Sequence, residues 1–165
     1  SPTIVWDGTE LVMVYAGHCY TRCDQAYGNT LLTARSSDGL TWVKDDEPAL
    51  VGGIAGIDWL KDGVAEPGLV QGPDDRWYLF LTGLSGEDRT IGIAVSDSAT
   101  GPWEVVPDPI LEADGTGFDG GQVLAPMVLI EGDLVRMWYL GFPAGMEGFA
   151  IGYAETDWQT LADLP

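Results

Sequence analysis

Positive charge is scarce in this chain. Its 165 residues include 26 aspartates and glutamates but only seven lysines and arginines, which gives a formal net charge of −19. Because such a surface repels phosphate backbones and anionic membranes, we expect neither a nucleic acid nor a membrane as partner. An acidic, lysine-poor surface fits an extracellular, secreted or periplasmic protein, and it also fits a high-salt cytoplasm or simple solubility.

Long apolar runs and helical periodicity are also lacking. No run approaches the ~20 residues that span a bilayer, and only "TDWQTLADL" near the C-terminus has the pattern of a helical turn. Phosphate-cradling glycine loops and C-x-x-C redox pairs are missing, which argues against nucleotide chemistry. We expect no cofactor. Ca²⁺ binding by the acidic turns "DGTE", "PDDR" and "EGD" is conceivable, but these turns lack a recognised ligand spacing.

Cysteine and histidine are rare and lie together. Cys19 and Cys23 are the only cysteines, and His18 is the only histidine. A disulfide that closes this short loop is the favoured interpretation. Two free buried thiols, or a metal site that adds His18 and Asp24, are the alternatives, although the spacing is not that of a zinc finger.

What the chain has is internal repetition. A proline opens each copy, then come a short apolar run, a polar turn, an aromatic-rich run and a glycine. The opening prolines are 65 and 59 residues apart, and such a period indicates one supersecondary unit stacked on copies of itself. We therefore predict a single domain with three repeats. The repeats cover residues 1–65, 66–124 and 125–165, and they open with "SPTIVWDGTELVMVYAG", "EPGLVQGPDDRWYLFLTG" and "APMVLIEGDLVRMWYLG".

Each repeat has the pattern of a four-stranded antiparallel meander. Residues alternate in polarity, are rich in β-branched and aromatic types, and are separated by Asp-Gly and other glycine turns. Meanders repeated around an axis form a β-propeller, so we predict an all-β fold with about 2.5–3 blades. The expected strands cover 3–6, 11–16, 30–36 and 42–50, then 68–71, 77–82, 90–96 and part of 103–111, then 127–130, 134–140 and 149–154.

Three blades do not close a ring, because known β-propellers have ~4–8 blades. Both faces of a blade are apolar, so the first and last blades would expose large apolar areas. We expect a second copy of the chain, or the remainder of a longer propeller chain, to cover them. A sandwich built from the same meanders is the alternative architecture.

The repeats resemble the five-bladed propellers of glycoside hydrolases of the family 43 and family 32 type, and the related family 130 phosphorylases. The segments "SPTIVWDGTELVMVYAG", "RSSDGLTWVKDDEPAL" and "APMVLIEGDLVRMWYLGF" carry the resemblance, which extends over essentially the whole chain. It implies a funnel along the propeller axis that binds a sugar. It also implies acidic residues at the start of innermost strands, before a proline. Those positions here are Ser1, Glu66 and Ala125, of which only Glu66 is a carboxylate.

Three carboxylates are candidates for catalysis. Glycoside hydrolysis needs two carboxyl groups on either side of the scissile bond, one of them a general acid. Glu66 has the apolar neighbours that suit a general acid, and capping of the strand edge or pairing with an arginine is its alternative role. Asp58 in "GIDWL" and Asp119 in "GFDGG" lie in loops before inner strands and are the candidate second carboxylates. Turn formation is the alternative role of both, since tight turns favour Asp beside Gly.

Three further residues are candidates for substrate binding. Trp59 follows Asp58 and could stack on a sugar face or pack between blades. His18 could face the funnel or be an ordinary loop histidine, and nothing near it suggests a catalytic triad. Arg35 lies in an expected strand, where it could pair with an inner acid or with surface charge on a neighbouring blade.

The sequence thus predicts a glycoside hydrolase-like propeller that acts on or binds a carbohydrate. The alternative is a non-catalytic carbohydrate-binding or structural module that keeps the fold. The vacant acid positions at Ser1 and Ala125 favour this alternative, whereas the intact repeats and Glu66 favour the enzyme.

Overall fold

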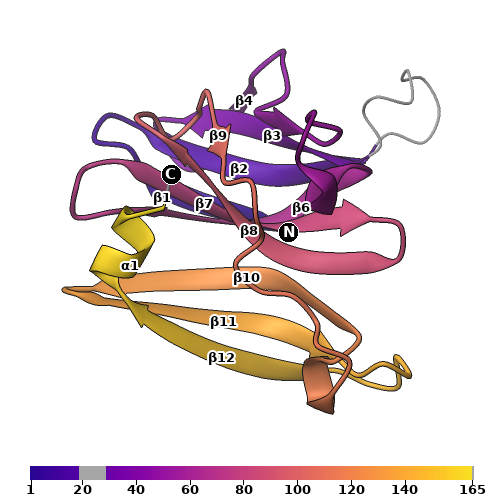
Figure 1. Ribbon diagram of the computed structural model, residues 1–165. Helices are drawn as coiled ribbons and strands as arrows, with labels where there is room; N and C mark the ends of the chain where they lie inside the picture. The colour runs from indigo at the N-terminus through magenta and orange to yellow at the C-terminus, as the bar shows by residue number, and fades with distance from the viewer. Residues whose placement is uncertain (19–28, 165) are drawn as a thin grey trace.

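Three antiparallel β-sheets lie side by side in the computed structural model, which describes residues 1–18 and 29–164 (Figure 1). They follow the order of the chain, with the sheet of residues 63–105 between the other two. The predicted all-β fold is confirmed. No helix within the described residues has the length and apolar character needed to cross a membrane.

The first sheet has five strands where the sequence predicts four. The expected outer strand is interrupted around Asp45 and Pro48, so that two short strands both pair with β3. The carboxylate of Asp45 accepts a hydrogen bond from the Thr33 hydroxyl at 2.5 Å, which holds the interruption against the sheet. The strands are β1 (Pro2–Trp6), β2 (Leu11–His18), β3 (Asn29–Ser36), β4 (Val43–Lys44) and β5 (Leu50–Val51).

The second sheet is a four-stranded meander. Its outer strand is only two residues long, because Pro107 and Pro109 follow it and cannot donate to a ladder. Beyond them a single bridge joins Leu111 to Ile91. The strands are β6 (Gly63–Gln71), β7 (Trp77–Ser85), β8 (Asp88–Ser96) and β9 (Glu104–Val105).

The third sheet has three strands and then a short helix. Asp157 caps this helix, because its side chain accepts a hydrogen bond from the backbone N–H of Thr160 at 2.9 Å. The helix lies beside the gap between the second and third sheets (Figure 1), and Trp158 contacts the ring of Tyr78 edge-on. The elements are β10 (Gln122–Glu131), β11 (Leu134–Phe142), β12 (Ala150–Asp157) and α1 (Trp158–Ala162).

The first strands of the three sheets lie next to one another, as they do around a propeller axis. The backbone N–H of Leu69 in β6 donates to the Thr3 hydroxyl in β1 at 3.3 Å. On the other side of β6, a Cβ added to Gly68 would lie 2.5 Å from the carbonyl oxygen of Pro126 in β10. This glycine therefore allows the backbones of two inner strands to approach closely.

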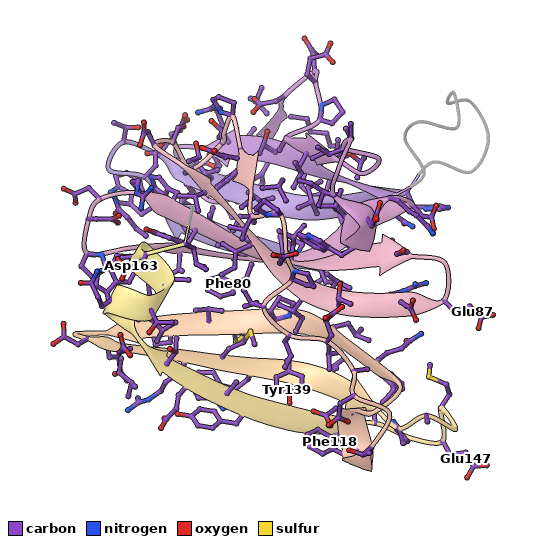
Figure 2. All side chains as sticks on the ribbon, in the orientation of Figure 1. Phe80, Glu87, Phe118, Tyr139, Glu147 and Asp163 are labelled. Atoms are coloured by element: carbon purple, nitrogen blue, oxygen red, sulfur yellow. The ribbon has the colours of Figure 1, made fainter. Side chains whose placement is uncertain are left out.

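Two apolar cores hold the sheets together. One lies between the first and second sheets and includes Val14, Leu31 and Leu79. The other lies between the second and third sheets and includes Phe80 and Met137, and Figure 2 shows Phe80 directed from the second sheet toward the third. Within residues 1–18 and 29–164, the middle sheet is thus buried on both faces, whereas each outer sheet is covered on one.

Candidate functional site

Two residues at the start of inner strands have a backbone conformation that few residues other than glycine adopt. Glu66 in β6 and Ala125 in β10 have φ angles of 50° and 55°, and each precedes a proline. The pairing of each strand with its neighbour changes register there. Such bulges re-aim side chains, and strain of this kind is concentrated at functional sites. The two positions are 59 residues apart and match, as the repeat predicts.

Hydrogen bonds to the neighbouring strands fix the carboxylate of Glu66. Its Oε2 accepts from the Thr82 hydroxyl at 2.8 Å and from the backbone N–H of Ala125 at 3.1 Å. The same N–H also contacts the Thr82 hydroxyl oxygen at 2.9 Å. Oε1 has no hydrogen-bond partner among the described residues, so it is available to a ligand.

Glu66 lines a pocket of about 320 Å³, which we call the Glu66 pocket. The other polar lining residues are Asn29 of β3, Arg89 of β8 and Gln122 of β10, so the pocket draws on all three sheets. Its apolar lining includes Leu84, Leu124 and Phe142. A concave site with a few convergent polar groups on an apolar wall is the usual form of a ligand site.

The polar residues around Glu66 are held in place by bonds to the adjoining turns. Arg89 donates through Nη1 to the carbonyl oxygens of Gly86 and Asp88, and Gln122 donates through Nε2 to the carbonyl oxygen of Glu87 at 2.7 Å. Our sequence analysis missed Asn29, Arg89 and Gln122. The short turn "SGED", which places Arg89 at a strand start, was the signal for one of them.

Asp58 lines a different pocket. It is exposed and begins the short 3-10 helix η2 (Asp58–Leu60). The pocket beside it has a volume of about 330 Å³ and is also lined by Asp88, Asp108 and Glu112. In residues 1–18 and 29–164, no group of three or more acidic, histidine or cysteine side chains lies close enough together to hold a metal ion.

Asp119 pairs with a tyrosine and does not line the Glu66 pocket. It ends the 3-10 helix η3 (Gly117–Asp119), and its Oδ2 accepts a hydrogen bond from the Tyr139 hydroxyl at 2.7 Å. Burial, together with this bond, raises the pKa of Tyr139 to about 12. Phe118 stacks on the same ring at a centroid distance of 6.4 Å, and Figure 2 shows the two rings close together. None of the pockets described by residues 1–18 and 29–164 therefore holds Asp58 or Asp119 together with Glu66.

Trp59 packs in the core and also lines the pocket beside Asp58. It is 7% exposed, and its indole covers the backbone at Gly83 and Gly92. Added Cβ atoms there would lie 2.1 Å and 2.3 Å from its ring carbons. The indole N–H also donates to the carbonyl oxygen of Val106 at 3.4 Å. Packing is the role that these contacts support.

Arg35 and His18 do not line the Glu66 pocket. The Arg35 guanidinium lies within 3.4 Å of carboxylates of Glu10 and Asp45, and it donates to the Thr100 hydroxyl, in the turn between β8 and β9, at 3.0 Å. It therefore links the β1–β2 turn to the β8–β9 turn. His18 contacts the side chain of Asn29 at 2.7 Å and lines another pocket. Cys19 and Cys23 fall outside the described residues.

Comparison with solved structures finds similar folds. A family 117 glycoside hydrolase of the marine bacterium Zobellia galactanivorans is 17% identical, with a TM-score of 0.69, and the match covers 94% of this chain and 50% of that one. A family 32 β-fructofuranosidase of Bombyx mori is 22% identical, with a TM-score of 0.67, and 93% of this chain and 32% of that one are covered. A thermostable family 43 glycoside hydrolase is 15% identical, with a TM-score of 0.66, and the match covers 94% of this chain and 50% of that one.

No family model and no curated protein matches the chain. The chain spans about half the length, or less, of the solved structures it resembles. At these identities the likeness concerns the fold. The three sheets match about half of the propeller fold of these structures.

Proposed function

We propose that the chain binds a carbohydrate in the Glu66 pocket and supplies Glu66 as one carboxylate of a glycosidase-like centre. The observation that carries this proposal is the strained, hydrogen-bonded Glu66 at the start of an inner strand, in a pocket drawn from three sheets. A carboxylate oxygen without a protein partner accepts hydrogen bonds from sugar hydroxyls. The apolar wall formed by Leu124 and Phe142 suits the C–H face of a sugar ring.

Hydrolysis of a glycosidic bond needs a second carboxyl group. The two carboxyl groups lie ~5–5.5 Å apart in enzymes that retain the anomeric configuration and ~6.5–9.5 Å apart in enzymes that invert it. Asp58 lines another pocket, and Asp119 is bonded to Tyr139. The position of the third sheet that matches Glu66 is Ala125, which has no carboxylate. We therefore propose that the second acid comes from further blades. These blades belong either to a second copy of the chain or to the remainder of a longer propeller chain. An extracellular or secreted setting fits both the acidic surface and a polysaccharide ligand.

The test compares wild type with Glu66→Gln on aryl-arabinoside, -xyloside and -galactoside substrates and in binding to oligosaccharides. We expect Glu66→Gln to lower hydrolysis ~10²–10⁴-fold, the usual effect of removing a general acid or base. Glu147→Gln is the control, because Glu147 is an exposed carboxylate in the turn after β11 (Figure 2). Equal and measurable rates for wild type and Glu66→Gln would refute the catalytic assignment.

A second candidate is a non-catalytic binding or assembly module. The alanine at position 125 and the uncovered faces of the outer sheets favour it. It predicts binding of an oligosaccharide that Glu66→Gln weakens, without turnover of any aryl glycoside.

A further inference from the structure

Arg89 differs from the other described arginines. Arg35, Arg76 and Arg136 each have a carboxylate oxygen within 4.0 Å. Arg89 forms no such pair with any described residue, although acidic residues outnumber basic ones 26 to seven in this chain. It lines the Glu66 pocket, so an unpaired guanidinium charge lies beside the proposed sugar site.

The contacts of Arg89 leave one edge of its guanidinium group available. Nη1 donates to the carbonyl oxygens of Gly86 at 3.1 Å and Asp88 at 2.7 Å, which ties the group to the β7–β8 turn. Nε and Nη2 make no hydrogen bond within residues 1–18 and 29–164. Two parallel N–H groups of this kind match the two oxygens of a carboxylate, and such bidentate pairs are both strong and geometrically selective.

The rest of the pocket limits where an anion can bind. Glu66 presents its partner-free Oε1, which repels a negative group and accepts from a hydroxyl. The side-chain N–H of Gln122 donates to the backbone carbonyl oxygen of Glu87, so the side-chain oxygen of Gln122 remains as a further acceptor. A ligand that satisfies these groups has an anionic group at Arg89, hydroxyls toward Glu66 and Gln122, and an apolar ring face toward Phe142.

We propose that the Glu66 pocket selects an acidic sugar, a hexuronic acid, whose ring carboxylate binds the Nε and Nη2 edge of Arg89. This inference rests on the carbohydrate-binding function proposed above. A neutral hexose would place a hydroxymethyl group at the same ring position and leave the guanidinium charge unmatched. Arg89 is then a specificity-determining residue, and the preference is a difference between the affinities for two sugars.

The experiment measures binding by calorimetry for three matched ligands in 0.15 M salt, which screens the repulsion from distant acidic residues. The ligands are a galacturonic acid trimer, the same trimer with its carboxyl groups reduced to alcohols, and a sulfated form of the reduced trimer. The variants are Arg89→Gln, Arg89→Lys and Glu66→Gln. Arg76→Gln is the control, because Arg76 pairs with Asp74 at 2.8 Å in the β6–β7 turn.

We expect wild type and Arg76→Gln to bind the uronic acid trimer about 10-fold or more tightly than the reduced trimer, the range of a charge-assisted hydrogen bond. Arg89→Gln loses this preference and keeps its affinity for the reduced trimer, and Arg89→Lys retains only part of the preference. Glu66→Gln weakens binding of both trimers.

If Arg89→Gln keeps the preference, or if the sulfated trimer binds best, the assignment of a carboxylate to Arg89 is wrong while carbohydrate binding stands. If no trimer binds wild type, both proposals are wrong.

Discussion

Two matching pairs of residues near the second and third sheets differ in polarity. Leu60 of η2 and Leu81 of β7 are fully buried in one apolar core. At the matching positions, 59 and 58 residues later, stand Asp119 of η3 and Tyr139 of β11, which share a hydrogen bond. A pair of buried leucines is thus replaced by a hydrogen-bonded carboxylate and tyrosine, which accounts for a half-buried carboxylate outside the Glu66 pocket.

This pair gives a residue-scale prediction. We expect Tyr139→Phe to lower the free energy of unfolding by about 1–3 kcal/mol at neutral pH, because it leaves the Asp119 carboxylate without its donor. The pKa of Tyr139 is raised to about 12 in the folded state, against the ordinary value of 10. The folded chain therefore holds this proton more tightly. The resulting stabilisation is complete below pH 10 and is lost as the pH rises toward 12.

Urea unfolding of wild type and Tyr139→Phe at pH 8 and pH 11 measures both effects. Tyr153→Phe is the control, because Tyr153 is exposed and bonds the exposed Glu155. An unchanged stability in Tyr139→Phe at pH 8, or a difference that grows at pH 11, would contradict the prediction.

At the scale of elements, the indole of Trp59 packs helix η2 against the second sheet. Trp59 covers β7 and β8 where Gly83 and Gly92 leave room for it. A methyl group at either glycine would overlap the ring, and the surrounding core is closely packed. The two glycines therefore determine where the loop before β6 lies.

Gly92→Ala should destabilise the fold by about 1–3 kcal/mol, because its Cβ would lie 2.3 Å from an indole carbon of Trp59. Thermal unfolding followed by circular dichroism measures the change. Gly145→Ala is the matched control, since a Cβ there meets nothing within 4 Å. A Gly92→Ala variant as stable as the control would mean that Trp59 is not packed in this way.

The inner strands and turns could be predicted from the sequence, because alternation and turn residues are local signals. The outer strands were predicted too long, since Pro48 and Pro107 interrupt pairing at positions that propensity alone does not weigh. Glu66 was recognisable from the proline repeat. The approach of Arg89 and Gln122 to Glu66 could not be predicted, because it depends on register across a bulge and between sheets. The burial of Trp59 could not be predicted either, because it depends on Gly83 of β7 and Gly92 of β8 lying side by side under the indole, which is a feature of the tertiary structure.

At the scale of the whole molecule, the two outermost faces are apolar, and no described residue covers them. In the third sheet, Val135 and Met137 face the second sheet while alternate residues face outward. Met127 and Ile151 on this outward face are 70% and 71% exposed, and Trp6 on the outward face of the first sheet is 57% exposed. In the repeat, the outward face of each outer sheet corresponds to a face of the middle sheet that is buried against its neighbour. Contiguous apolar faces of this kind mark interaction sites.

The molar mass of the protein in solution, measured by light scattering at several concentrations in physiological salt, shows whether the outer faces are blade interfaces. We predict at least twice the chain mass of 17.7 kDa, because the uncovered faces associate when no further blades are present. Met127→Glu should lower the measured mass by placing a charge on that face. A wild-type monomer of 17.7 kDa at every concentration would contradict the proposal that the outer faces are blade interfaces.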